Sequence, residues 1–298
     1  MGFDVKKILV PVDFSETGNL ALEHASFMAR LIKADLTLLH VMPVNDYHFS
    51  IPEPILHIEE RERLSKVVET KLNELSEATR ENYGIRVNTL SASGQIAHEV
   101  VSIAQDEKFD LIIMGTHGAK GFEEMFIGSN AHKVVSVAPC PVITVQTHAK
   151  KLGYNNILLP IDRSIHSREK VKTAIGMAKY FHSKIHILGL LESDEASEYD
   201  KLQIVLDQVQ DAIEKAEVNF SRSTVEGSNL AHEALKAGQV MNSDLIIIMT
   251  DHESEMTGIF MGPVAKQIVN HSRIPVMSIK PSYHNFQSVN LGGGSGIY

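Results

Sequence analysis

The sequence predicts an α/β fold built twice, each copy a parallel sheet covered by helices on both faces. Two observations carry this prediction. Short apolar segments without alternating polarity are separated by segments whose apolar residues recur at helical spacing, which is typical of parallel strands buried on both faces. The same order of segments then occurs a second time, from about residue 156 onward. A chain of 298 residues is long enough for two such units.

The elements of the first half follow in order. The apolar segments expected to be strands cover residues 7–12, 36–41, 85–90, 109–114 and 142–145. The segments with helical periodicity cover about residues 20–32, 56–81, 95–104 and 131–137. Ser15 and Ser129 are expected to be N-caps of the first and last of these helices. The prolines of residues 42–54 break any regular element there.

The repeat is visible in four pairs of similar segments. Residues 156–162 match 7–13, 230–233 match 96–99, 243–247 match 109–113, and 274–276 match 140–142. We therefore expect one domain over residues 1–149 and a second over 154–281, with a linker at 148–154. Residues 282–298 have the composition of a flexible tail and are expected to belong to neither core.

Composition narrows the classes of function. The chain is 43% hydrophobic and 22% charged, as globular proteins are, and its formal net charge of −9 argues against non-specific binding of nucleic acid or of anionic membranes. No stretch approaches the roughly 20 apolar residues of a membrane-spanning helix, and the first residues lack the apolar core of a signal peptide. The single cysteine, Cys140, excludes an intrachain disulfide and suits a reducing compartment. We expect a cytoplasmic protein.

A glycine-rich segment, residues 115–129, joins the apolar segment 111–114 to the helix at 131–137. Glycines allow backbone N–H groups to approach a phosphate closely, and the first turn of the following helix offers unpaired N–H donors. The segment lacks the Walker pattern and the dinucleotide pattern G-x-G-x-x-G, because Gly115, Gly118 and Gly121 are evenly spaced by three. The alternative interpretation of the glycines alone is a flexible surface loop.

The spacing within this segment is more specific. Gly115, two residues, Gly118, nine residues and then Gly128-Ser129 resembles the nucleotide-binding signature G-x2-G-x9-G-(S/T) of the universal stress protein family. The resemblance covers nearly the whole chain except the tail. It implies two tandem Rossmann-like domains (adenine nucleotide alpha hydrolase-like), each with a five-stranded parallel sheet. It also implies a homodimer of tandem chains, whose two halves pack with pseudo-two-fold symmetry.

The resemblance implies a site for ATP, with or without Mg²⁺, in the first half. Asp13 corresponds to the acidic residue beside the adenine and ribose, and the backbone of Val41 to the group that meets the base. The remaining positions follow strands or open the last helix, where open α/β sheets bind ligands. The full expected set is Pro11, Val12, Asp13, Val41, Met114, Gly115, His117, Gly118, Gly128, Ser129 and Asn130.

The second half departs from the signature. Alignment on the strands replaces Gly115 by Met249, Gly118 by His252 and Ser129 by Pro263, and keeps Gly128 as Gly262. Side chains then stand where backbone must approach a phosphate, and proline removes an N–H donor. We predict that the second half does not bind ATP in the manner of the family. Asp162, the counterpart of Asp13, is then better interpreted as a polar turn residue.

A metal site in the second half is an alternative. His252 stands among Asp251, Glu253 and Glu255, which are metal-ligand types. The pairs His98-Glu99 and His232-Glu233 are expected to point to different sides of their helices and to form no chelate. Solvated polar residues are the preferred interpretation of all of these, so no metal site is predicted.

Two functions of different class remain open, together with a third possibility. The first is a nucleotide-dependent binding or signalling module without catalysis, in which the second half is structural or regulatory. The second is a slow ATPase or phosphotransferase, for which His117 and Lys120 are the local candidates for groups that act on the phosphate. Ser129 is the candidate neighbour of the Mg²⁺ that hydrolysis would need. A third is a site filled by a different small ligand, such as another nucleotide. We favour binding, because no acid–base pair is evident and no catalytic residue is predicted.

Overall fold

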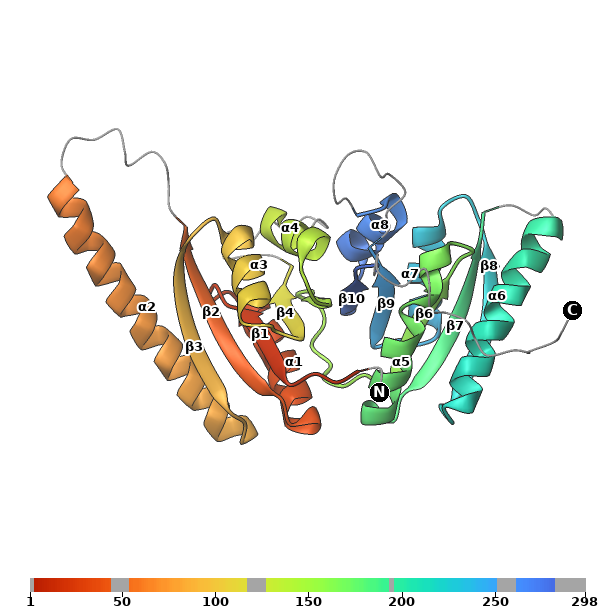
Figure 1. Ribbon diagram of the computed structural model, residues 1–298, viewed down its shortest axis with the longest axis horizontal. Helices are drawn as coiled ribbons and strands as arrows, with labels where there is room; N and C mark the ends of the chain where they lie inside the picture. Colours follow the sequence, from red (N-terminus) through yellow and green to blue (C-terminus); the bar gives the residue numbers. More distant parts are fainter. Residues whose placement is uncertain (1–2, 44–53, 117–126, 193–195, 251–260, 282–298) are drawn as a thin grey trace, which may run out of the picture.

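The computed structural model describes residues 3–43, 54–116, 127–192, 196–250 and 261–281, with the backbone alone at 54–61 and at 165. His117 and Gly118 of the predicted site lie outside the described residues, as do Lys120 and the segment around His252. The described part alternates strands and helices in both halves, as the sequence predicts (Figure 1).

The first half contains five strands and four helices among its described residues. They are β1 (Lys7–Pro11), α1 (Glu16–Ile32), β2 (Asp35–Pro43), α2 (Pro54–Tyr83), β3 (Val87–Gly94), α3 (Ile96–Asp106), β4 (Leu111–Gly115), α4 (Ser129–Val137) and β5 (Val142–Val145). The predicted strand at 85–90 begins and ends too early. β3 is an edge strand with several exposed positions, so its polar residues extend the strand without an apolar signal.

The second half repeats this order with one departure. Its elements are β6 (Asn156–Ile161), the 3-10 helix η2 (Ile165–Arg168), α5 (Val171–Phe181), β7 (Lys184–Leu191), α6 (Ala196–Lys215), β8 (Phe220–Glu226), α7 (Leu230–Val240), β9 (Leu245–Met249), α8 (Pro263–His271) and β10 (Val276–Ile279). The departure is η2, which occupies the place where α1 begins in the first half.

A glycine explains this departure. A Cβ on Gly18 would lie 2.7 Å from Asp13 Oδ1, so a side chain at residue 18 would displace the carboxylate around which the first turn of α1 is built. The counterpart of Gly18 in the second half is Ser167, at the same offset of 149 residues that relates Asp162 to Asp13. The Ser167 side chain excludes the same helical start, and the chain forms η2 before α5 begins.

The strands form one continuous ten-stranded sheet, in the order β3-β2-β1-β4-β5-β10-β9-β6-β7-β8. All pairs within each half are parallel, and the pair β5–β10 that joins the halves is antiparallel. Helices α1, α2, α5 and α6 contribute to one apolar core, and α3, α4, α7 and α8 contribute to the core on the opposite face. Each core contains residues of both halves, so the sheet is covered on both sides across the junction. The predicted fold of two five-stranded α/β domains is confirmed.

The junction has the register of a two-fold axis. Ile143 of β5 pairs with Met277 of β10, and Val142 pairs with Ser278. Since 277 − 143 = 134, the offset that relates the two copies in this region, Ile143 faces its own counterpart. The central strands of the two copies therefore meet as equivalent strands meet in a symmetric dimer.

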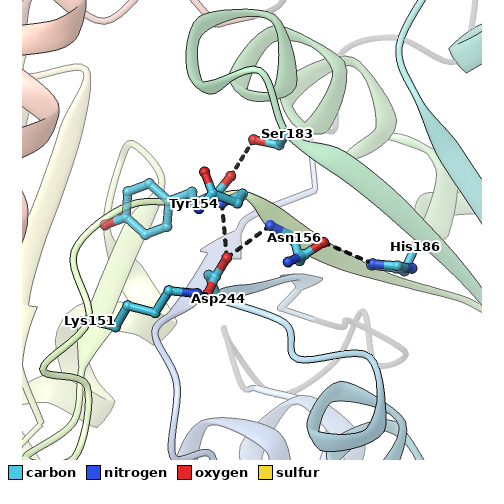
Figure 2. Close-up of polar contacts among 7 residues, drawn as sticks. Lys151, Tyr154, Asn156, Ser183, His186 and Asp244 are labelled. Atoms are coloured by element: carbon cyan, nitrogen blue, oxygen red, sulfur yellow. Dashed lines mark hydrogen bonds and ion pairs between the residues drawn. The ribbon is translucent and has the colours of Figure 1, made fainter.

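An aspartate, half-buried in the first half and buried in the second, fixes the start of the first strand in each half. Asp110 Oδ2 accepts hydrogen bonds from the backbone N–H groups of Lys6 and Lys7, both at 2.9 Å. Asp244 Oδ2 accepts the N–H groups of Asn155 and Asn156, both at 3.0 Å (Figure 2). The repeat thus conserves a contact that closes the edge of the sheet opposite to the predicted site. Among the described residues, no helix has the length and apolar composition needed to cross a membrane.

Candidate functional site

The predicted site lies at the carboxyl edge of the sheet in the first half. β1 is central there, with β2 on one side and β4 on the other. The chain continues from β1 outward to β2 and from β4 outward to β5, so the strand order reverses between β1 and β4. Open α/β sheets bind ligands in the crevice at such a point. The residues after β1 and β4 and the start of α4 all reach this edge.

Asp13 follows β1 and forms a tight turn with Ser15. Asp13 Oδ1 accepts the Ser15 N–H at 3.1 Å and the Ser15 hydroxyl at 2.6 Å. Ser15 Oγ in turn accepts the N–H of Gly18 at 3.0 Å, so Ser15 is the N-cap of α1, as predicted. The turn holds an exposed carboxylate at the rim of the crevice, next to the positive end of a helix.

The residue after Asp13 has a strained backbone. Phe14 has a φ of 61°, in the left-handed region that is costly for residues with a side chain. Its ring stacks on His40 with ring centroids 4.9 Å apart, and the Nδ1–H of His40 donates to the Val12 carbonyl at 2.7 Å. The Lys71 ammonium lies over the Phe14 ring, 5.4 Å from its centre. These contacts fix the direction in which the chain leaves β1. No sequence pattern predicts these contacts, because Phe14 and His40 belong to no periodic segment.

Two signature glycines are tightly packed within the protein itself. A Cβ on Gly115 would lie 3.0 Å from the backbone of Thr17, and one on Gly128 would lie 2.9 Å from the carbonyl oxygen of Thr116. Met249 replaces Gly115 in the second half, where η2 stands in place of the start of α1. The closeness of α1 to β4 therefore disfavours a side chain at position 115 whether or not a ligand is bound.

The glycine-rich segment is closed at its base. The Gly128 N–H donates to the Thr116 carbonyl at 2.7 Å, and the Thr116 N–H donates to Val145 at 3.0 Å. Thr116 and Gly128, the described residues on either side of residues 117–126, therefore lie next to each other at the edge of the sheet, directly before α4. The expectation that Ser129 caps α4 is wrong. Gly128 is the N-cap, with φ −58° and ψ 149°, and Ser129 is the first helical residue, with no side-chain cap bond formed.

The described residues of the predicted set fall into three groups. Val12, Val41 and Met114 are buried, with 5 to 6% of their surface exposed, so they can offer a ligand mainly backbone groups. Asp13 and Ser129 are exposed, and the others are half-buried. By position in the fold, Pro11, Val12 and Asp13 lie at or just past the end of β1, Val41 lies near the end of β2, and Met114 and Gly115 end β4. Gly128, Ser129 and Asn130 lie at the start of α4.

The described residues contain no group of three or more His, Cys, Asp and Glu side chains placed to hold a metal ion. The segment with His252 is outside the described part, so this finding does not bear on the alternative of a metal site there. The expectation that His98 and Glu99 point to different sides of α3 is wrong. Nδ1 of His98 lies 3.3 Å from Oε1 of Glu99, so the two side chains turn toward each other. His98 is exposed and Glu99 is half-buried, and adjacent side chains on a helix can turn toward each other when they are long enough.

The fold is that of a tandem α/β protein, and the described residues of the predicted site lie at the carboxyl edge of its sheet. A family model described as the universal stress protein family matches residues 4–146 and 153–280. The chain belongs to the universal stress protein family and contains two copies of its domain.

Individual relatives match one copy at a time. Universal stress protein MJ0531 of Methanocaldococcus jannaschii is 31% identical over 153 residues, which are 49% of this chain and 85% of that protein. Universal stress protein YxiE of Bacillus subtilis is 30% identical over 145 residues, covering 47% of this chain and 98% of that protein. Single-domain relatives thus align with about half of the chain.

Two solved structures match the tandem arrangement. A universal stress protein from Archaeoglobus fulgidus has a TM-score of 0.75 and 20% identity, covering 93% of this chain and 99% of that one. A putative universal stress protein from Pseudomonas aeruginosa has a TM-score of 0.71 and 19% identity, covering 93% and 94%. At this identity the similarity shows the fold, and it extends across both halves.

Proposed function

We propose that this protein is a stress-response nucleotide-binding protein, whose first half binds ATP or a related adenine nucleotide and whose second half is structural or regulatory. The observation that supports the proposal is the convergence of Asp13, Val41 and Gly115 with the start of α4 at the point where the strand order reverses. The family signature adds the glycine spacing of the intervening segment.

Each group has a physical role in this proposal. The Asp13 carboxylate accepts hydrogen bonds from ribose hydroxyls, and the Val41 backbone meets the edge of the base. The N–H groups of the first turn of α4, together with the helix dipole, face the phosphates. Ser129 is exposed there, so its hydroxyl can serve as a neighbour of a phosphate-bound Mg²⁺. None of these roles requires a chemical step.

The ligand can be identified directly. The full chain is purified, denatured with acid, and the released small molecules are identified by mass spectrometry; ATP binding is then measured by calorimetry. We expect close to one nucleotide per chain. Gly118→Val should weaken binding at least about tenfold, since a side chain there blocks the approach of backbone to phosphate. His252→Val is the matched control, because His252 is the counterpart of Gly118 in the second half and should be neutral for ATP.

Three results would contradict the proposal. A wild-type protein that neither carries nor binds any adenine nucleotide at millimolar concentration removes its central claim. A stoichiometry of two per chain removes the claim that the second half has lost the site. Efficient Mg²⁺-dependent phosphate release that His117→Ala or Lys120→Ala abolishes favours the alternative of an ATPase.

We also propose a cytoplasmic location and a homodimer of tandem chains, with domains at 1–149 and 154–281 and the tail 282–298 outside both cores. The single cysteine supports a reducing compartment. The dimer is tested by light scattering on the purified chain, where the mass of a single chain would contradict it. Limited proteolysis tests the boundaries, since we expect cleavage in the tail before any cleavage in the two cores.

A further inference from the structure

The second half contains a small pocket at the carboxyl edge of its own strands. Its volume is about 30 Å³. The polar lining residues come from the end of β6, from η2 and from the start of α5: Asp162, Ser164, Ser167 and Lys170. The apolar lining comes from β7, from the end of β9 and from the first turns of α8, and includes Leu190, Ile248, Met249 and Val264.

This pocket occupies the position that the nucleotide crevice has in the first half. With offsets of 149 and 134 residues, Asp162 corresponds to Asp13 and Met249 to Gly115. The pocket is too small for a nucleotide. A single buried water needs a cavity of about 10–15 Å³, so this pocket has room for only two or three waters. The second copy therefore has, at the carboxyl edge of its strands, a cavity with room for only a few heavy atoms.

Two polar side chains in the pocket have no polar counterpart in the first half. Ser167 replaces Gly18 and Lys170 replaces Ala21. Ser167 is 2% exposed and Lys170 is 3% exposed. They are three residues apart on successive helical turns, so both face the same side. Replacement of two small residues by a buried hydroxyl and a buried ammonium changes the chemistry of the edge, while the order of strands and helices is kept apart from η2.

The hydrogen bonds of Ser167 leave one donor unused. Ser167 Oγ accepts the Asp162 N–H at 3.0 Å and the Lys170 ammonium at 3.1 Å. These two bonds occupy both lone pairs of the hydroxyl oxygen. Its proton has no acceptor among the described residues, although the side chain is almost completely buried and lines the cavity. A buried donor of this kind is costly unless an acceptor is present.

The other residues that line the pocket also favour a ligand that accepts hydrogen bonds. Val264 and Ala265 lie in the first turn of α8, where backbone N–H groups have no partner within the helix. Asp162 is the carboxylate among the described lining residues, and its Oδ1 already accepts the N–H of Ser164 at 2.9 Å and the Ser164 hydroxyl at 2.6 Å. Lys170, the Ser167 hydroxyl and the start of α8 thus make the cavity rich in donors.

We propose that this pocket is a second ligand site, which binds a small oxyanion of the size of inorganic phosphate. The ammonium of Lys170 and the hydroxyl of Ser167 donate to its oxygens, and the start of α8 contributes its dipole. The site is distinct from the nucleotide crevice of the first half and does not depend on it.

Phosphate binding to the full chain carrying Gly118→Val tests this inference, because that variant removes the phosphate loop of the first half from the measurement. We expect calorimetry or ³¹P NMR titration to show saturable binding of close to one phosphate per chain. Lys170→Met should weaken it by about tenfold or more, since it removes the charge and keeps the aliphatic stem. Ser167→Ala should weaken it about three- to tenfold. Lys172→Met, an exposed lysine on the same helix, is the matched control.

The outcomes separate this inference from the proposed function. Absence of phosphate binding at millimolar concentration overturns the inference and leaves ATP binding in the first half untouched. Phosphate binding that survives both Ser167→Ala and Lys170→Met also overturns it. If Lys170→Met does not fold, Ser167→Ala decides, with circular dichroism as the check that the variant is folded. ATP binding that Lys170→Met abolishes while the chain stays folded would place the nucleotide in this pocket and contradict both proposals.

Discussion

His24 of α1 and Tyr154 of the segment between the halves form a buried pair, with Nδ1 of His24 3.2 Å from the Tyr154 hydroxyl oxygen. Nε2 of the same ring lies 2.7 Å from the Ala149 carbonyl oxygen. A carbonyl can only accept, so Nε2 carries the proton, and the neutral Nδ1 accepts the hydrogen of the Tyr154 hydroxyl. The ring thereby links α1 to two points of the connecting segment. Protonation of Nδ1 removes the acceptor for the Tyr154 hydroxyl and so breaks one of these two hydrogen bonds.

This pair makes stability depend on pH. Burial lowers the pKa of His24 below its ordinary value of 6.5. The unfolded chain therefore binds more protons than the folded chain as the pH falls, so the stabilisation is complete above about pH 6.5 and is lost toward lower pH. Burial shifts the pKa of His132 and His186 in the same direction. We expect the free energy of unfolding to fall as the pH drops below about 6.5, by up to about 1.4 kcal/mol per pH unit for the buried His24 and by less for the other two histidines, which are more exposed to solvent.

Urea unfolding at several pH values measures this dependence. His24→Gln should lower stability near pH 7 and reduce the pH slope. His98→Gln, at a side chain that is 73% exposed, is the control and should change neither. A slope that is unchanged in His24→Gln would mean that the buried ring does not control the pH response.

Asp244 should contribute strongly to stability and Lys151 weakly. Asp244→Ala leaves two backbone N–H groups without their acceptor, at about 1–3 kcal/mol each. Lys151 forms an ion pair with Asp244 at 2.5 Å, but its side chain is 66% exposed, so Lys151→Met should cost less than about 1 kcal/mol. Chemical denaturation of both variants checks the ranking, and Asp110→Ala should reproduce the larger loss. Equal costs for Asp244→Ala and Lys151→Met would contradict it.

Gly115→Ala should destabilise the protein even without nucleotide. The added Cβ lies 3.0 Å from the Thr17 backbone, and overpacking of this kind costs about 1–3 kcal/mol. Thermal unfolding of the nucleotide-free chain measures the effect, with Met249→Ala in the second half for comparison. An unchanged melting temperature for Gly115→Ala would show that the glycine serves only a ligand.

Cys140 should react slowly in the folded protein. Burial, with a smaller contribution from Asp110, raises the pKa of its thiol to about 12. The thiolate fraction near pH 8 is then on the order of a thousandfold below that of an ordinary cysteine. Modification by a chromogenic disulfide should be slow in buffer and fast in denaturant. Rapid reaction of the folded chain would show that the thiol is accessible and ionised.

The fold was predictable because the signals for it are local and occur twice. Apolar strands such as 142–145 coincide with the observed β5 (Val142–Val145), and Ser15 caps α1 as its position before the helix indicates. Edge strand β3 was placed less well, since its exposed polar residues carry no apolar pattern. The N-cap of α4 was assigned to Ser129 from residue preference, whereas the backbone places Gly128 there.

The details of the sites were less predictable, because they depend on contacts between distant residues. The approach of Gly115 to Thr17 and the strained Phe14 on His40 have no signature in a single sequence. Ser167 and Lys170 did leave a signal that was missed. Aligned with the first half, they replace Gly18 and Ala21 by polar residues at two neighbouring positions of one helical face.

The register at which Ile143 faces Met277 bears on how the two copies could diverge. A strand edge that pairs with its own counterpart would also pair with an identical copy, so separate halves would form three kinds of dimer. Joining the two halves through a short segment holds β5 and β10 at high effective concentration, so the first half pairs with the second half of the same chain. The second copy then no longer has to keep a ligand site of its own in order to pair with the first. Only the pairing edge must be kept, and substitutions such as those at Met249 and Lys170 can accumulate at the other edge without loss of the partner.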